Sequence, residues 1–327
     1  MAIVATTVVY FEALRDVALA RSLDNVEDER LDVLVKADQT PVNSTTHAEL
    51  DRTVNDAMLS GLGRYSSDQF LAMRSNTFLV NEEPELVPLG ECPCRLSGIA
   101  SGPEDVPAVN PDGSVDPRGE GALIACDCRR FLFMTVPDLE NSVRVFDGEL
   151  PTPLSEAPPL GQPMTIDALI DVNAASVFGL QVGDTIAAEP FWDSLREEVV
   201  VRVSGIYQRS DPDDLRWHIH DSEFTDLTPN LAWARFVVPE ITLLDALGPY
   251  FPNMGAEYVW LMDTDTGSIH ATDTGAVRAE LTAGSNTLKP VIDGFRIETE
   301  LGDRLADFEA HVRGGFVDTK QVGPRPD

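Results

Sequence analysis

Two β-α-β patterns, at residues 31–80 and 257–299, lie on either side of a long irregular segment, and this arrangement is what most constrains the fold. Strands and helices that share one sheet must bury their apolar sides together, even when they are far apart in the chain. We therefore expect one discontinuous α/β subdomain from residues 26–85 and 236–300, with residues 86–235 inserted into it. The predicted fold class is α+β.

The first pattern begins with the alternating stretch Leu-Asp-Val-Leu-Val at 31–35, which indicates a strand. Thr46 with Glu49 three residues later has the spacing of a capping box, so a helix is expected to begin there. The short apolar run at 77–80 is the predicted second strand of this unit.

The inserted segment differs in composition from both units. Proline, glycine and acidic residues crowd its first part, which is typical of a loop-rich region. Short strands are expected between the loops, at 122–125, 131–136 and 142–146. The segment is therefore predicted to be a β-rich subdomain.

After the loop-rich part, regular secondary structure is predicted most clearly at residues 177–207. Gly183 and Asp184 supply turn chemistry, because glycine tolerates positive φ and aspartate bonds to its own backbone. Residues 199–203 are β-branched at four of five positions, which favours a half-buried strand. This stretch predicts a turn that leads into an antiparallel β unit.

Both ends of the chain have helical patterns. Apolar residues at helical spacing predict a helix over 12–23, and residues 1–25 are assigned to a membrane-proximal stalk. The apolar start of the chain is too short to span a bilayer and is expected to be the outer end of a helix that continues into a membrane. A second amphipathic helix is expected at 301–313, followed by a disordered tail at 314–327.

The charge of the chain excludes several partners. With 55 acidic and 24 basic residues, the 327-residue chain carries a net charge of −31. Nucleic-acid binding requires clustered Lys and Arg that release counterions, and docking on anionic lipid requires a basic patch. Neither kind of surface is expected here, so no nucleic-acid partner is predicted.

Four cysteines form two Cys-X-Cys pairs, Cys92 with Cys94 and Cys126 with Cys128. Residues i and i+2 of a strand face one side, so each pair can present two sulfurs together. Disulfides, a structural zinc ion and free thiols remain as alternatives. A location outside the cell favours disulfides, and in every case the cysteines would have a structural role.

Catalytic signatures are absent from the sequence. There is no G-x-S-x-G, P-loop, G-x-G-x-x-G or H-E-x-x-H motif, so an enzyme is not expected and no catalytic or cofactor-binding residue is nominated. His218, His220 and Asp221 form the one candidate metal cluster outside the cysteines, with further Asp residues nearby. They lack a third ligand of clear spacing, so an exposed polar loop around Trp217 is the preferred interpretation.

The order of these features resembles the extracytoplasmic core domain of FtsX-like and MacB-like ABC transporter permeases. The matching stretches are residues 12–23, 31–35, 179–186, 199–217, 236–240, 257–265 and 297–312. The most specific of them contain a glycine-aspartate turn, a strand ending in Gly-Ile and an acidic loop with Trp. Their marker residues are Gly179, Gly183, Asp184, Gly205 and Trp217. The proline-rich, cysteine-bearing part at 86–165 departs from the family pattern.

The resemblance implies a Porter-like α/β part made of two β-α-β units with an inserted Sabre-like β part. It also implies a membrane-anchored protein whose domain lies outside the cell membrane and relays motion driven by ATP hydrolysis (mechanotransmission). The implied partners are the protein's own transmembrane helices, a cytoplasmic ABC ATPase and a second permease copy. Both ends of the chain should then lie together at one end of the molecule.

Two other functions stay open at this point. One is a secreted or surface-attached binding module, and the other is a metal-dependent hydrolase that uses His218 and His220.

Overall fold

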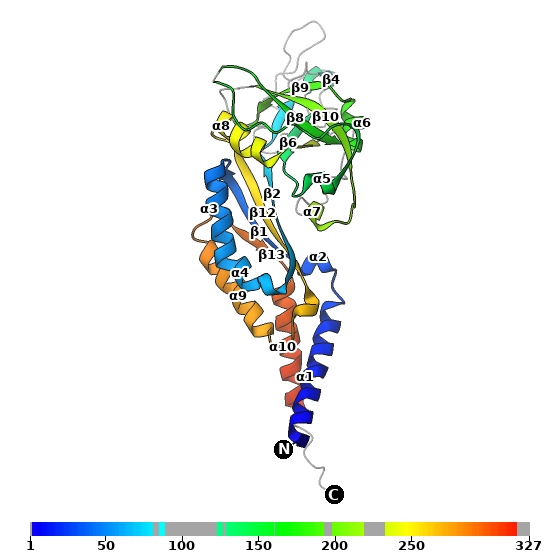
Figure 1. Cartoon of the computed structure of the whole chain (residues 1–327), viewed down its shortest axis with the longest axis vertical. Coiled ribbons are helices and arrows are strands. Elements are labelled where there is room, and N and C mark those ends of the chain that lie inside the picture. The colour runs from blue at the N-terminus through cyan, green and yellow to red at the C-terminus, as the bar shows by residue number, and fades with distance from the viewer. Residues whose placement is uncertain are drawn as a thin grey trace.

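The computed structural model describes residues 2–80, 85–88, 123–126, 129–159, 161–192, 198–218 and 233–318. The molecule is elongated, with a β barrel at one end, a sheet covered by helices in the middle and two long helices at the other end (Figure 1). The fold is thus a mixture of helices and sheet, as the sequence predicted.

A four-stranded antiparallel sheet forms the middle of the molecule. Its strands are β1 (Val33–Pro41), β2 (Ser66–Ser75), β12 (Gly255–Thr264) and β13 (Arg296–Glu298), in the order β2-β12-β1-β13. Strand β12 therefore separates β1 from β2, and β1 separates β12 from β13. Each predicted β-α-β unit is split by a strand of the other unit, which is the interlocked arrangement of ferredoxin-like sheets.

Helices cover one face of this sheet. They are α3 (Ser44–Val54), which continues through the π-helical turn η1 (Asn55–Leu59) into α4 (Ser60–Leu62), and α9 (Thr274–Leu288). Alternate residues of the strands point at them, such as Val35 on β1 and Trp260 on β12, and both are buried. The Trp260 Nε1 donates a hydrogen bond to Asp51 of α3 at 3.1 Å, which fixes that helix to the sheet.

The structure corrects three details of this subdomain. Its second strand is β2, whose polar start at 66–69 concealed it, while 78–80 forms β3 (Phe78–Val80) of the barrel. The helix begins at Ser44, since Asn43 caps it by accepting a 2.8 Å hydrogen bond from the Thr46 amide, so the predicted capping box is wrong. The helical pattern at 274–281 predicts an end at Gly284, but α9 continues to Leu288 and passes Gly284 where a Cβ would lie 3.0 Å from Met58.

The inserted strands close into a six-stranded barrel, which the sequence did not predict. Besides β3 it contains β6 (Arg130–Met134), β8 (Met164–Asp171), β9 (Thr185–Pro190), β10 (Val199–Arg209) and β11 (Trp233–Val237). The ring runs β3-β6-β11-β8-β10-β9 and returns to β3. Closure depends on the parallel pairing of β6 with β11, which lie about a hundred residues apart and leave no local pattern.

Aromatic side chains fill the barrel. Phe78, Phe131 and Phe133 are fully buried, with ring centroids 5.0–5.5 Å apart, and Phe236 meets Phe131 edge to face at 5.0 Å. Rings at such separations gain specific edge and stacking contacts in addition to burial. The barrel is therefore a packed core and not a channel.

A β-bulge in β10 produces a second core outside the barrel wall. The pairing of β10 with β8 shifts between Val203 and Gly205, so Val203 faces the barrel interior while Tyr207 faces outward. There Tyr207 stacks on the buried Trp217 of α7 (Leu215–His218), with ring centroids 6.1 Å apart. The bulge thus fixes the segment after β10 against the barrel.

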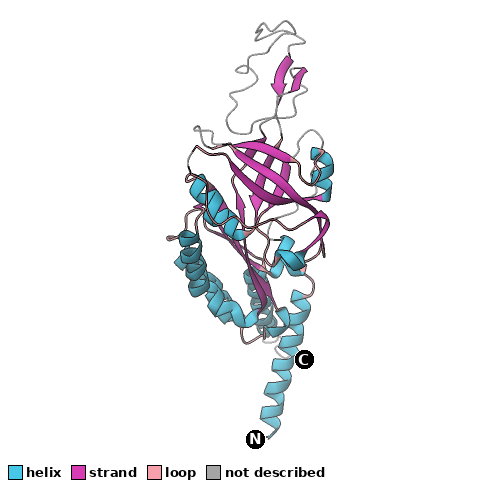
Figure 2. Ribbon diagram, turned by 45° about the horizontal axis from the view of Figure 1, so that its top comes forward, coloured by secondary structure: helices cyan, strands magenta, loops and turns pink. Residues whose placement is uncertain are grey.

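The remaining elements of the inserted part are short. Strands β4 (Glu85–Pro88) and β5 (Leu123–Cys126) form a separate two-stranded sheet, and strand β7 (Val143–Gly148) pairs with β10. The short helices are α5 (Leu139–Ser142) and α6 (Val172–Phe178). After β11 come the π-helical turn η4 (Thr242–Leu247) and the helical turn α8 (Gly248–Tyr250). Figure 2 shows β4 and β5 beyond the barrel, at the end farthest from the long helices.

The two ends of the chain form a stalk of α1 (Ala2–Leu23) and α10 (Leu301–Asp318), which lie side by side (Figure 1). Both helices therefore extend from the same end of the molecule, as expected. Helix α10 continues through 314–318, which were predicted to be disordered, while the rest of that predicted tail lies outside the described residues. Leu19, Leu305 and Phe308 are buried in the core that extends from the sheet into the stalk.

Replacing Leu19 with Ala is expected to destabilise the protein by about 2–5 kcal/mol, because a fully buried Leu leaves a cavity when it is truncated. The matched control is Val17→Ala on the same helix, where the side chain is 66% exposed. Thermal and denaturant unfolding of the three proteins measures the effect. Equal stability of the two variants would show that α1 does not pack on the rest of the molecule.

Candidate functional site

The cysteine and histidine candidates lie largely outside the described part of the chain. The structure gives the backbone of Cys126 at the end of β5 and that of His218 at the end of α7. Cys92, Cys94, Cys128, His220 and Asp221 are outside the described residues. Disulfides, structural zinc and free thiols therefore remain alternatives. Among the side chains that the structure does describe, no three His, Cys, Asp or Glu residues are grouped to hold a metal ion.

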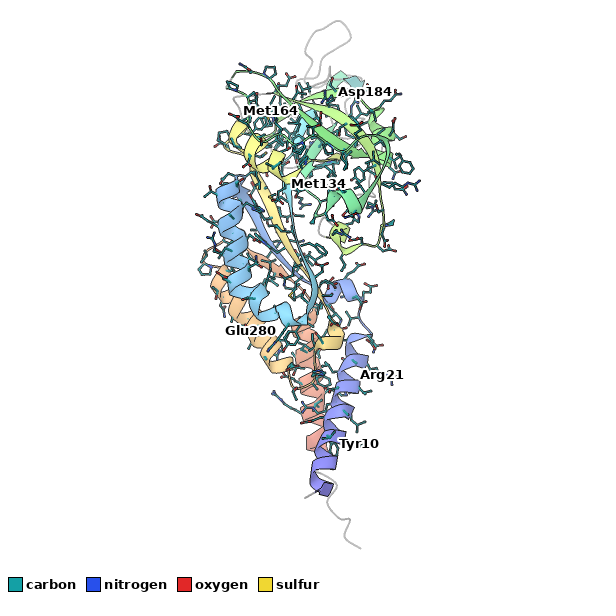
Figure 3. The ribbon with its side chains drawn as sticks, in the orientation of Figure 1. Tyr10, Arg21, Met134, Met164, Asp184 and Glu280 are labelled. Carbon is teal, nitrogen blue, oxygen red and sulfur yellow. The ribbon has the colours of Figure 1, made fainter. Side chains whose placement is uncertain are left out.

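The predicted turn at Gly183 and Asp184 is confirmed. Gly183 has φ of 91°, a conformation that favours glycine, and the Asp184 side chain accepts a hydrogen bond from the Gln181 amide at 2.8 Å. Strand β9 then pairs antiparallel with β10, as expected. In Figure 3 Asp184 lies in the barrel, at the opposite end of the molecule from Tyr10 on the stalk.

The other marker residues have structural roles. Gly179 ends α6 with φ of 69°. At Gly205 a Cβ atom would lie 2.7 Å from the Glu149 carbonyl oxygen, so only glycine fits the bulge without displacement of the backbone. Trp217 is buried and stacks on Tyr207, so it anchors the segment after β10.

A cluster of ion pairs and hydrogen bonds lies where the stalk joins the sheet. We call this the stalk junction: α2 (Asp28–Leu31), Asp32 and the first residues of β1, the end of β12 and residues 299–304. The Glu300 amide donates to the Arg30 carbonyl at 2.8 Å, and the Arg30 guanidinium pairs with the Glu300 carboxylate. Arg304, one turn into α10, pairs with the same carboxylate at 2.7 Å. Glu300 therefore links the start of α10 to the segment that follows α1.

These two arginines determine the charge state of Glu300. The hydrogen bond from Arg304 and then that from Arg30 hold the pKa of the Glu300 carboxyl below its usual range. Both arginines are partly exposed, so each pair alone adds little stability and the network acts by fixing geometry.

Asp32 is the one deeply buried carboxyl of the junction, 3% exposed. Its Oδ1 accepts a hydrogen bond from the Thr264 amide at 2.9 Å, and the Thr264 hydroxyl donates to the Leu31 carbonyl at 3.0 Å. Burial raises the pKa of the Asp32 carboxyl to about 6, and the neighbouring carboxylate of Asp263 adds to the effect. The side chain therefore joins β1 to β12 and changes its charge near neutral pH.

The helices of the stalk have further polar contacts with the α/β subdomain. Asp16 of α1 accepts a hydrogen bond from the Ala271 amide at 2.8 Å, in the segment after η5 (Thr266–Ser268). Glu309 of α10 accepts from the Thr274 hydroxyl and from Arg278 of α9, both at 3.0 Å. Both stalk helices are thus connected to the same edge of the subdomain.

A groove of about 340 Å³ opens at the junction. Its lining consists of Glu29, Arg30, Asp32, Leu34, Leu261, Glu298, Thr299 and Glu300. The carboxylates of Glu298 and Glu300 are already paired with Lys36 and with the two arginines, respectively. These two carboxylates are therefore engaged within the protein.

Sequence reasoning did not find Arg30, Asp32 or Glu300. Each is a single charged residue at the edge of a predicted element, and most residues of that kind are simply solvated. The one available signal is that Asp32 is the single charged residue within the strand predicted at 31–35.

Comparison with known protein families and with curated proteins found no family and no curated protein that matches this chain. Among the described helices, none combines the length and the apolar character needed to cross a bilayer.

The free energy of unfolding of the Asp32→Asn variant, relative to that of the wild type, should be higher at pH 8 than at pH 5. The folded state binds the Asp32 proton more tightly than the unfolded state, so its contribution is full below pH 4 and is lost as the pH rises through about 6. Asn keeps an acceptor for Thr264 and never ionises. The difference in free energy of unfolding between variant and wild type should grow by about 1 kcal/mol from pH 5 to pH 8.

Denaturant unfolding at the two pH values measures this change. The control Asp307→Asn, at an exposed position on α10, should show no such growth. A pH-independent difference for Asp32→Asn would mean that the carboxyl is ionised at both pH values.

Proposed function

We propose that this chain is the extracytoplasmic domain of an ABC transporter permease of the FtsX-like and MacB-like kind. In this proposal the subdomain of β1, β2, β12 and β13 is the Porter-like part, and the barrel is the Sabre-like part. The domain carries out no catalysis itself. It relays motion from the stalk to the barrel, driven by a cytoplasmic ABC ATPase.

The observation that supports this best is the stalk. Helices from the two ends of the chain lie side by side and connect to the same sheet (Figure 1). A helix resists compression along its axis because its backbone hydrogen bonds run along that axis. Displacement of either helix end therefore reaches the sheet through Arg30, Glu300 and Asp16.

The free end of α1 also favours a membrane-proximal position. Val9, Tyr10, Phe11 and Leu14 all expose apolar side chains there, as does Val17 one turn later. Contiguous exposed apolar side chains mark a surface that meets a partner or a membrane. In the proposal, α1 and α10 continue into the protein's own transmembrane helices.

The sheet is connected directly to the barrel through backbone and side-chain hydrogen bonds. Strand β2 reaches the barrel strand β6 through the pairing of Arg74 with Met134. The Thr135 amide donates to the Met73 carbonyl, and the Met73 amide donates to the Thr135 hydroxyl, both at 2.9 Å. These contacts lie in a buried region, so the sheet and barrel would move together.

The complete coding sequence tests whether the chain is flanked by transmembrane helices. On this proposal it encodes one apolar helix of about 20 residues before residue 1 and three after residue 320. Sequencing of the complete gene provides the measurement. A gene that encodes no such helices would instead favour a secreted or surface-attached binding module.

Arg30→Glu should uncouple the stalk from the barrel, because it places two carboxylates opposite each other at residues 30 and 300. The measurement uses the membrane complex, purified with its ATPase and second permease copy. Spin labels are placed at Val17 or at Val177 of both copies, and ATP should change the distance between the two labels. We expect the change at Val17 of the stalk to persist in the variant, and the change at Val177 of the barrel to be lost.

The charge-swapped double variant Arg30→Glu with Glu300→Arg should restore the response at Val177 at least in part, since Arg304 would repel the new arginine. Arg21→Glu, at an exposed position of α1, is the matched control and should behave as wild type. The proposal fails if no ATPase copurifies, or if the response at Val177 is the same in Arg30→Glu and wild type.

A further inference from the structure

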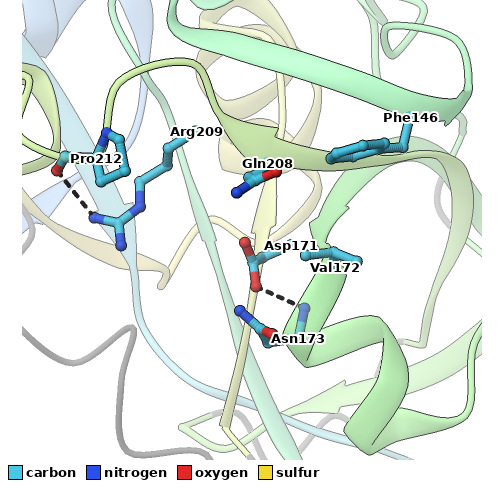
Figure 4. A pocket seen from close by; sticks show the side chains of 7 residues that line it. All are labelled: Phe146, Asp171, Val172, Asn173, Gln208, Arg209 and Pro212. Atoms are coloured by element: carbon cyan, nitrogen blue, oxygen red, sulfur yellow. Dashed lines mark hydrogen bonds between the residues drawn. The ribbon is translucent and has the colours of Figure 1, made fainter.

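A second cavity lies on the outer wall of the barrel, far from the stalk junction. It has a volume of about 260 Å³ and is lined by Phe146, Asp171, Val172, Asn173, Gln208, Arg209 and Pro212. Figure 4 shows Phe146 on one side and Asn173 on the other, with Asp171 and Gln208 between them. The volume is small for a ligand pocket and corresponds to one ring-sized molecule.

Rigid elements hold these side chains. Phe146 comes from β7, Gln208 and Arg209 from the end of β10, and Asp171 from the end of β8. Asp171 accepts a hydrogen bond from the Asn173 amide at 2.8 Å through one carboxylate oxygen. The cavity is thus a feature of the barrel wall, and among its lining residues only Pro212 comes from the turn after β10.

One face of the Phe146 ring is covered and the ring remains accessible. The Arg144 guanidinium lies 5.3 Å from the ring centroid, while the side chain as a whole is 54% exposed. Val172 adds a second exposed apolar surface to the cavity. An exposed aromatic ring next to a cavity offers a flat apolar surface to a ligand.

The polar side chains around the ring suit a ligand without charge. Asn173 and Gln208 both donate and accept hydrogen bonds, whereas Asp171 accepts and Arg209 donates. The carboxylate of Asp171 disfavours anions at short range, as does the net charge of −31 at long range, and Arg209 disfavours cations. A neutral molecule rich in hydroxyl groups matches this mixture of donors and acceptors.

An unsatisfied hydroxyl lies in the same part of the wall. Tyr207 is directly opposite Asp171 in the pairing of β10 with β8, and its buried hydroxyl has no hydrogen-bond partner. A buried hydroxyl without a partner costs free energy, so it is rare in structures that lack a functional reason for it. Tyr207 thus adds an unsatisfied polar group to the barrel wall, on the residue opposite Asp171, which lines the cavity.

We infer that this cavity binds a single neutral sugar ring, whose apolar face packs on Phe146 and whose hydroxyls bond to Asp171, Asn173 and Gln208. The inference does not rest on the transporter proposal, since either can fail without the other. No covalent step is involved. The site would give the barrel a means of recognising glycans.

The test uses saturation-transfer NMR and calorimetry on the full chain with D-glucose, D-galactose and N-acetyl-D-glucosamine as probes. At least one of them should bind saturably, with weak affinity typical of a single ring. Phe146→Ala and Asn173→Ala should each weaken that binding by about tenfold or more, which corresponds to about 1.4 kcal/mol. Glucuronate and glucosamine, which keep the ring and carry charges of opposite sign, should bind more weakly than the neutral sugars.

Phe191→Ala is the matched control, since Phe191 is an exposed aromatic residue that does not line the cavity. It should bind the probe as wild type does. Both Phe146 and Asn173 are exposed, so their variants should keep the wild-type melting temperature. The inference is overturned if no neutral sugar binds, if Phe146→Ala binds like wild type, or if a charged analogue binds equally well.

Discussion

The pairing of β1 with β12 is the interaction on which the whole arrangement depends. It joins the first and last thirds of the chain through a register that runs from Val33 with Met262 to Pro41 with Gly255. Because these two strands are the central pair of the sheet, their outer neighbours β2 and β13 and the covering helices all require them. The same pairing brings α1 and α10 together, since each helix leads into or out of this sheet.

Charge is distributed unevenly over this framework. The chain is strongly acidic, yet arginine is concentrated where elements distant in sequence meet. Arg296 contacts both Asp38 and Glu257 across the open face of the sheet, and Arg74 pairs with Glu257 as well. A planar guanidinium can bridge two carboxylates, which explains the preference for arginine over lysine at such positions. These bridges hold neighbouring strands in register.

Sequence reasoning succeeded where a pattern is local and failed where the cause is distant. The strand at 199–203 is β-branched at four of five positions, the strand at 257–262 is a short, largely apolar run, and both were found. Strand β2 was missed because its first half is polar and exposed, and β3 was assigned to the wrong subdomain because three residues cannot specify a partner. Barrel closure and the contacts of Arg30 and Asp32 depend on segments more than a hundred residues away, so no local pattern could indicate them.

The barrel leaves and rejoins the sheet at neighbouring points. The chain departs after Ser75 of β2 and returns at Gly255 of β12, where Ser75 is paired with Ala256 and the Asn76 amide donates to the Gly255 carbonyl at 3.0 Å. A tight turn could join these two strands directly without altering the sheet. The barrel is therefore an insertion between two adjacent strand ends, which evolution can remove, enlarge or exchange while the sheet and stalk persist. Diversification of what the molecule recognises would then concentrate in the inserted part.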